Sequence, residues 1–189
     1  LIDDRGCSPD EAADLMQRIL DIAAEYVECG DALALKSGRP HYEVDDAVWA
    51  ASNDVMKHAL ELGANLDCVV QLHTEASEDL TEIADWADAR GLNPLHVVKH
   101  YASGRLAGPT PSVMCKKDWL ETAAESGAPF LMETDYVDDP DRPGAVMGPK
   151  TVPRRVRWLR EQGYDDAVNT AHVETPKRVY GIDTRRTLE

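Results

Sequence analysis

The sequence predicts an α/β fold in which parallel strands alternate with helices. Three observations lead to this prediction: five short apolar stretches of strand length, amphipathic stretches of helix length between them, and capping residues or glycines at the boundaries. Strands that alternate with helices are joined by right-handed crossovers and therefore run parallel. No stretch of about 18 apolar residues occurs, so the sequence predicts no membrane-spanning helix.

The first half of the chain contains three predicted helices and two predicted strands. A helix is expected over residues 8–30, because Ser8 and Glu11 are spaced as a capping box around Pro9. The capping signal of the third helix is Ser77. The remaining elements follow from periodicity and glycine stops: strands over 31–35 and 66–72, and helices over 45–63 and 77–91.

The second half continues the alternation with one shortened connection. Strands are expected over 94–99, 111–115 and 129–134, and helices over 116–127, 151–163 and 175–181. The link between His100 and the predicted strand 111–115 is too short for a full helix. The loop 138–149 is long and rich in Pro, Gly and Asp, as is typical of a segment that covers a site.

The charge balance constrains the class of protein. The chain has 35 acidic and 20 basic residues among 189, a formal net charge of −15. The acids recur in every predicted helix, which indicates a uniformly acidic surface that tolerates high salt. We favour a halophilic, cytoplasmic protein, with an ordinary acidic protein as the alternative. Such a surface argues against strong non-specific binding to nucleic acid.

The four cysteines indicate neither a zinc knuckle nor a disulfide framework. Cys7, Cys29, Cys68 and Cys115 lie far apart, and no Cys-x-x-Cys pair occurs. We expect reduced, buried thiols, as is usual in the cytoplasm.

Four residues with metal-ligand or acid–base chemistry lie where predicted strands end. They are Lys36, His73, His100 and Asp135. The carboxyl ends of parallel strands carry the active sites of barrel enzymes. Imidazoles and carboxylates suit divalent ions such as Zn, Mn or Fe. Four such residues at successive strand ends predict a metal site.

Five segments resemble one known family. The segments "GRPHY", "VVQLHTE", "VVKHYASG", "FLMETD" and "ETPKRVYGI" are similar to the TatD-related metal-dependent hydrolases, especially their archaeal branch. These belong to the amidohydrolase superfamily, whose enzymes are TIM (β/α)8 barrels. The resemblance covers essentially the whole chain. It implies a single domain over residues 1–189 that corresponds to the C-terminal part of a barrel, about strands 4–8.

The resemblance also implies site residues. One or two divalent ions (Zn, Mn, Mg or Fe) would be bound by His73, His100 and Asp135, and Asp135 would also act as general base. The family position of a bridging carboxylate falls on Lys36. The family's first strand carries a His-x-His pair that this chain lacks. We therefore expect the chain to begin after the third strand, without the N-terminal part of the barrel.

Lys36 has two interpretations. It is either a lysine whose stem packs while its amine reaches the barrel mouth, or an amine that CO2 carboxylates into a metal bridge. Relatives elsewhere in the superfamily, such as phosphotriesterases, carry such a bridging lysine. For the two histidines, an ordinary core position is the alternative to metal binding.

Further residues near these strand ends are candidates for supporting roles. Arg39, His41 and Tyr42 are predicted to contact substrate, although a structural role in the loop is equally compatible with the sequence. Glu75 and His96 are predicted to support the ligands, with core packing as the alternative for His96.

The sequence thus predicts a metal-dependent hydrolase that uses a metal-activated water. The resemblance implies phosphodiester cleavage, as in TatD-type deoxyribonucleases, on a small-molecule or nucleic-acid phosphoester. A lactonase- or phosphotriesterase-like hydrolase with carboxylated Lys36 is a second hypothesis. A degenerate, non-catalytic barrel that acts as a binding module is a third, and metal content distinguishes it from the other two.

Overall fold

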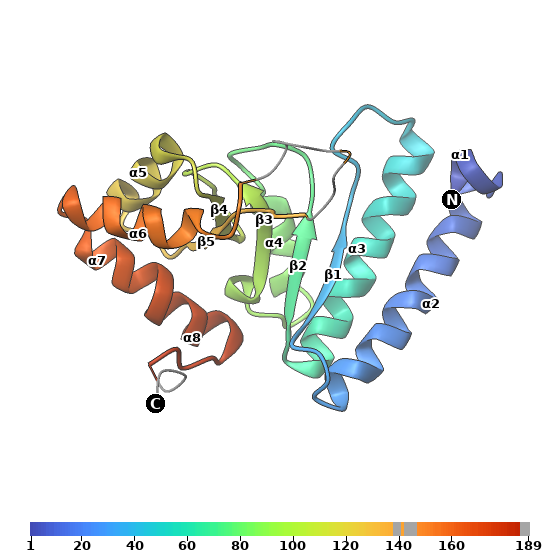
Figure 1. The fold of residues 1–189 in the computed structure, drawn as a ribbon. Coiled ribbons are helices and arrows are strands. Elements are labelled where there is room, and N and C mark those ends of the chain that lie inside the picture. The colour runs from blue at the N-terminus through green and yellow to red at the C-terminus, as the bar shows by residue number, and fades with distance from the viewer. Residues whose placement is uncertain (138–140, 142–146, 186–189) are drawn as a thin grey trace.

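The protein folds around one parallel sheet. The computed structural model describes residues 1–137, 141 and 147–185, and its five strands lie in the order β1-β2-β3-β4-β5, each beside the next (Figure 1). All four strand pairs are parallel. The strands are β1 (Ala34–Gly38), β2 (Val69–His73), β3 (Val97–Ala102), β4 (Thr110–Met114) and β5 (Leu131–Glu133). The prediction of a parallel α/β fold is confirmed.

Helices lie at both ends of this sheet. α2 and α3 run side by side next to β1 and β2, whereas α5 to α8 gather beyond β4 and β5 (Figure 1). The helices are α1 (Ile2–Arg5), α2 (Pro9–Glu28), α3 (Asp46–Leu66), α4 (Thr81–Asp88), α5 (Lys117–Ser126), α6 (Thr151–Glu161), α7 (Asp165–Asn169) and α8 (Thr175–Tyr180). A 3₁₀ turn, η1 (Pro94–His96), precedes β3, and a π-helical turn, η2 (Thr170–Glu174), joins α7 to α8.

Two of the predicted boundaries are wrong for identifiable reasons. β1 starts at Ala34 rather than residue 31, because the amides of Asp31 and Ala32 donate to the carbonyl oxygen of Tyr26 and close α2 instead. Lys36 lies in the middle of β1 rather than at its end, because the pairing of β1 with β2 continues to Gly38 and His73.

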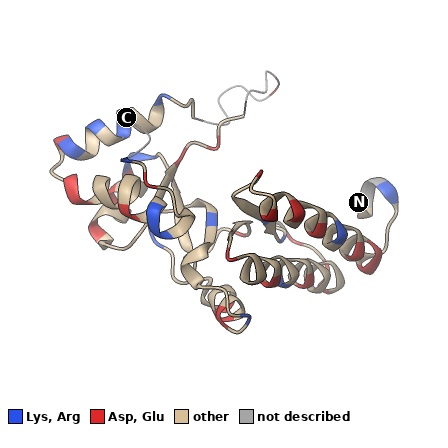
Figure 2. Cartoon of the chain, turned by 90° about the horizontal axis from the view of Figure 1, so that it is seen from below, with Lys and Arg blue, Asp and Glu red and all other residues tan. Residues whose placement is uncertain are grey.

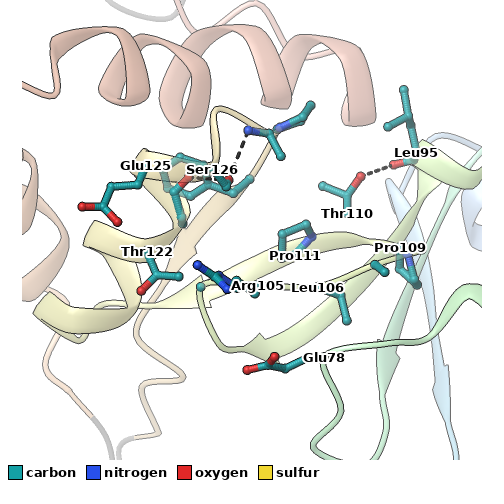
Figure 3. Close-up of a pocket in the computed structure, with 17 residues that line it drawn as sticks. Glu78, Leu95, Arg105, Leu106, Pro109, Thr110, Pro111, Thr122, Glu125 and Ser126 are labelled. Carbon is teal, nitrogen blue, oxygen red and sulfur yellow. Dashed lines mark hydrogen bonds between the residues drawn. The ribbon is translucent and has the colours of Figure 1, made fainter.

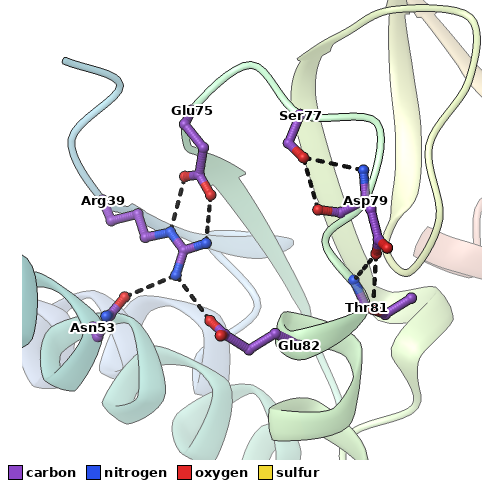
Figure 4. Close-up of polar contacts among 7 residues, drawn as sticks. All are labelled: Arg39, Asn53, Glu75, Ser77, Asp79, Thr81 and Glu82. Carbon is purple, nitrogen blue, oxygen red and sulfur yellow. Dashed lines mark hydrogen bonds and ion pairs between the residues drawn. The ribbon is translucent and has the colours of Figure 1, made fainter. Parts of the chain in front are cut away.

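α4 starts at Thr81, and Ser77 does not cap it. The hydroxyl of Ser77 instead contacts the backbone of Asp79, whose carboxylate accepts from the amide and hydroxyl of Thr81 (Figure 4). By contrast, Ser8 and Glu11 form the predicted capping box at the start of α2.

The connection between β3 and β4 contains no helix, as its length predicts. Residues 103–109 run back along the molecule, and Thr110 then pairs with Val98. This shortened connection leaves a cavity of about 750 Å³, which lies between the loop, the start of β4 and α5 (Figure 3).

The core consists of two main apolar clusters, which lie between the sheet and the helices α3 to α6. One packs α3 and α4 against β2 and contains Met56, Leu60 and Leu72. The other packs α5 and α6 against β4 and contains Leu120 and Leu159. The opposite side of the sheet is covered near its base by Val179 of α8, which lies against Val69 and Val98.

The described surface agrees with the predicted distribution of charge. Acidic residues occur along helices on both sides of the molecule (Figure 2). Cys68 and Cys115 are buried as expected, but Cys29 is exposed; all four thiols are free. In the described part of the chain, every helix is too short or too polar to span a bilayer. Most of the predicted loop 138–149 lies outside the described residues.

Candidate functional site

Three of the predicted ligands lie together at the carboxyl edge of the sheet. His73 is the last residue of β2, His100 lies two residues before the end of β3, and Asp135 follows β5 by two residues. The rings of His73 and His100 are 5.4 Å apart between centroids. Nε2 of His100 lies 3.4 Å from Oδ1 of Asp135. Side chains from three separate strands therefore face one another.

Glu133 fixes the orientation of the His100 ring. Its carboxylate lies 2.9 Å from Nδ1 of His100 and also accepts from the Ser112 hydroxyl and the Tyr101 amide. Burial raises the pKa of Glu133, but the hydrogen bonds from His100 and Ser112 outweigh it and hold the pKa below its ordinary value. An ionised Glu133 keeps the His100 proton on Nδ1. The Glu133 contact thus holds the ring with its Nε2 on the side of Asp135.

His41 extends this cluster from the loop after β1. Its Nδ1 lies 3.1 Å from Nε2 of His73. The loop is held by a close approach of the two strands: the amide of Arg39 donates to the carbonyl oxygen of His73, and a Cβ on Gly38 would lie 1.9 Å from that oxygen. Only glycine fits there, so the end of β1 and the end of β2 are locked together.

The pKa of His73 lies below its ordinary value. Partial burial is the main cause, and the nearby charges of His100, His41, Lys99 and Lys36 act in the same direction. A lowered pKa keeps the imidazole neutral near pH 7, which is the form that binds metal ions.

Arg39 lies inside the protein rather than in an open site. Its side chain is 6% exposed, and its guanidinium donates two hydrogen bonds to Glu75, one to Asn53 and one to Glu82 (Figure 4). It also stacks 4.4 Å from the centroid of Trp49. Because these donors already have protein partners, we assign Arg39 and Glu75 to the support of the site rather than to substrate.

His41 and Tyr42, by contrast, remain accessible. Both are exposed and line a shallow hollow of about 510 Å³ together with Glu43, Trp49 and other residues of the 40–46 segment. Their contact with substrate stays a prediction.

Lys36 and His96 lie elsewhere than the sequence indicated. Lys36 pairs in register with Gln71, and its Nζ donates to the Gln71 side chain at 3.0 Å. That position is two residues below the Gly38–His73 pair. His96 lies in η1, before β3 begins, with Nδ1 3.7 Å from Asp67. It is therefore at the amino end of β3, opposite to His100, and the prediction that it supports the ligands is wrong.

The donor groups match a divalent ion in kind but not in spacing. Within residues 1–137, 141 and 147–185, no three His, Cys, Asp or Glu side chains converge closely enough to hold one as they stand. The chemistry nevertheless fits: two imidazoles and a carboxylate lie side by side, and the Glu133 contact leaves Nε2 of His100 free to ligate.

Three residues near the site were missed by sequence reasoning. The ring of Tyr101 lies 6.0 Å from that of His100 and 6.3 Å from that of Trp119, between centroids. Nζ of Lys116 lies 3.8 Å above the Trp119 ring. Lys116 follows β4 by two residues, so the strand-end rule that found His73 also applies to it.

The comparisons with known proteins identify the family. The model of the TatD related DNase family matches residues 5–181. The chain belongs to the TatD related DNase family. The chain is 40% identical over 155 residues to an uncharacterized protein of Methanocaldococcus jannaschii. The aligned region covers 77% of this chain and 55% of that protein. The chain thus spans about half the length of this relative.

Two solved structures have folds similar to that of this TatD-related chain. An organophosphorus hydrolase from Deinococcus radiodurans is 14% identical, with a TM-score of 0.55 over 78% of this chain and 54% of that one. A mutant organophosphorus hydrolase, also 14% identical, has a TM-score of 0.57 over 89% and 63%. This likeness concerns the fold, and the prediction of part of a TIM-barrel-type arrangement is confirmed.

Proposed function

We propose that this chain carries the metal-binding part of a metal-dependent hydrolase that cleaves phosphoester bonds. The observation that supports this proposal is the meeting of His73, His100 and Asp135 from β2, β3 and β5 at one sheet edge. Membership of the TatD related DNase family favours a phosphodiester as substrate.

This proposal assigns the residues to metal binding, to support of a ligand and to proton transfer. His73, His100 and Asp135 hold one divalent ion, which would supply Lewis acidity and lower the pKa of a water molecule. Glu133 keeps the His100 ring in its orientation. In this proposal the Asp135 carboxylate, whose side chain is 34% exposed, also accepts a proton as general base.

Metal uptake and hydrolysis test the proposal together. The chain is dialysed against Mn²⁺ or Zn²⁺, its metal content is measured, and hydrolysis of bis(p-nitrophenyl) phosphate and of an oligonucleotide is followed. We expect His73→Ala and His100→Ala to lose both metal and activity. His58→Ala is the matched control, because His58 pairs with Asp21 on the α2–α3 surface. Absence of metal in the unmodified chain favours the non-catalytic binding module instead.

A carboxylated Lys36 is the second candidate, and the register supports it. Lys36 lies two residues below the Gly38–His73 pair on the same strand, and its amine donates to the side chain of Gln71. In this hypothesis CO2 adds to the neutral amine, a N–C bond forms and a proton leaves, which yields a carboxylate toward the ions. The activity would then be closer to that of a lactonase or phosphotriesterase.

Two substitutions distinguish the Lys36 states. Lys36→Glu supplies a permanent carboxylate, whereas Lys36→Arg keeps a charge that CO2 does not modify. If the lysine is carboxylated, intact mass increases by one CO2 in bicarbonate, and Lys36→Glu retains metal while Lys36→Arg loses it. If the lysine stays an amine, mass is unchanged and Lys36→Arg retains metal.

A further inference from the structure

Tyr101 has an unusual backbone conformation for an aromatic residue. Its φ is +56°, in the left-handed region that bulky side chains rarely adopt. The contact that holds it there is the hydrogen bond from its amide to Glu133 Oε1, at 2.7 Å. The same carboxylate orients His100. The strain therefore fixes an aromatic ring in place beside a predicted metal ligand.

The ring that this conformation places is available to a ligand. Tyr101 is 40% exposed, although it is a large aromatic residue at the carboxyl edge of the sheet. It lies edge-on between the rings of His100 and Trp119, with interplanar angles of 69° and 82°. The three rings form a continuous aromatic border that leads away from the histidine cluster.

A cation completes this border. Nζ of Lys116 lies 3.8 Å from the Trp119 centroid and 5.9 Å from that of Tyr101. Among the described residues, no carboxylate forms an ion pair with Lys116. In a chain with 35 acidic and 20 basic residues, a lysine without a carboxylate partner among the described residues is a candidate to meet an anionic ligand.

We propose that Tyr101, Lys116 and Trp119 form a substrate subsite beside His100, which binds a planar ring joined to an anionic group. The ring stacks against Tyr101, and the anionic group pairs with Lys116. This subsite rests on the proposed function, since it places the ester bond of the same molecule at His100 and Asp135. A free nucleotide and the end of a nucleic-acid strand share this chemistry.

Binding without added metal tests the subsite independently of hydrolysis. Calorimetry at low salt compares thymidine 5′-monophosphate with its two parts, thymidine and inorganic phosphate. We expect the nucleotide to bind more tightly than either part. An oligonucleotide that binds more tightly than the nucleotide identifies a strand as the ligand, whereas equal affinities identify a small molecule.

Variants of Tyr101 and Lys116, each with a matched control elsewhere on the chain, show whether the nucleotide binds at this subsite. Tyr101→Asn removes the ring but suits the left-handed backbone, and we expect a loss of about tenfold in nucleotide affinity. Tyr101→Phe keeps the ring and the affinity. Lys116→Gln weakens binding of the nucleotide and of phosphate but not of thymidine. The controls are Tyr26→Asn, on exposed α2, and Lys117→Gln, whose amine stacks on Trp158 instead.

The outcomes separate this proposal from the hydrolase. If the wild-type chain binds no nucleotide, or if Tyr101→Asn and Tyr26→Asn behave alike, the subsite is refuted. If nucleotide binding follows the Tyr101 and Lys116 variants while the chain takes up no metal, the subsite stands and the hydrolase proposal fails. Circular dichroism confirms that each variant is folded.

Discussion

Two cationic regions lie at the carboxyl edge of the same sheet, and they differ in what surrounds the charge. Arg39 follows β1 and Lys116 follows β4, and each lies over a tryptophan ring, at 4.4 Å and 3.8 Å. Arg39 is buried among Glu75, Glu82 and Asn53. Lys116 has aromatic neighbours and no ion pair within the described residues.

The comparison shows that the surrounding carboxylates decide whether a cation supports the fold or meets a ligand. The planar guanidinium of Arg39 matches the two oxygens of Glu75 and links β1 to the β2–α4 loop and to α3. A lysine amine is a point charge and does not form such a fork. Lys116 lies against aromatic rings without an ion pair among the described residues, and it therefore remains available to a ligand. Arg39, by contrast, donates from each guanidinium nitrogen to a partner within the protein.

The largest expected effect is on stability at Arg39. Arg39→Ala leaves Glu75 without its partner and should lower the free energy of unfolding by about 3 kcal/mol. Urea denaturation measures this loss. Arg160→Ala is the control, because its contact with Asp165 is exposed and should change stability by less than about 0.5 kcal/mol. Equal losses in the two variants would show that the Arg39 cluster is not a structural element.

The second largest expected effect is on metal affinity, at Glu133, whose carboxylate contacts both His100 and the Tyr101 amide. Glu133→Gln removes the charge that orients His100, and the affinity for a divalent ion should fall by about 10- to 100-fold. Metal titration measures it, with Glu125→Gln as control on the surface beside Tyr164. If both variants bind metal like the wild type, His100 is not a ligand that Glu133 positions.

Local signals in the sequence predicted much of the fold and the centre of the site. The capping box at Ser8, the apolar periods and the glycine stops lie within a few residues of the elements they define. His73 and Asp135 follow from the rule that polar residues at parallel strand ends meet. These features are short in range, so the sequence alone displays them.

The features that sequence reasoning missed depend on long-range partners. Arg39 is buried by Glu75 and Glu82, which lie 36 and 43 residues away, and Tyr101 is held by Glu133, 32 residues away. Neither pairing has a local pattern. The position of Lys36 was mistaken for a similar reason, because β1 continues past Lys36 to Gly38, where it pairs with His73 of another strand.

The titration of His172, whose ring contacts Met132 of β5, should have a smaller effect. Burial lowers the pKa of His172, and the charge of Arg160 adds to this. The unfolded chain therefore takes up a proton near pH 6.5 before the folded chain does, so stability is full above that pH and falls below it. The free energy of unfolding should therefore decrease as the pH is lowered through about 6.5. His172→Leu should remove this part of the pH dependence in urea titrations, and an unchanged profile would refute the assignment.

The smallest expected effect is the change in stability on substitution of Tyr101, beside Lys116. It is the strictest test of the comparison between the Arg39 and Lys116 regions. Tyr101→Asn removes an exposed ring and also relieves a left-handed backbone, so the two contributions to stability oppose each other. The free energy of unfolding should change by less than about 1 kcal/mol. A loss as large as that of Arg39→Ala would place Tyr101 in the supporting structure. An unchanged stability together with weakened nucleotide binding would show that its strain serves a ligand rather than the fold.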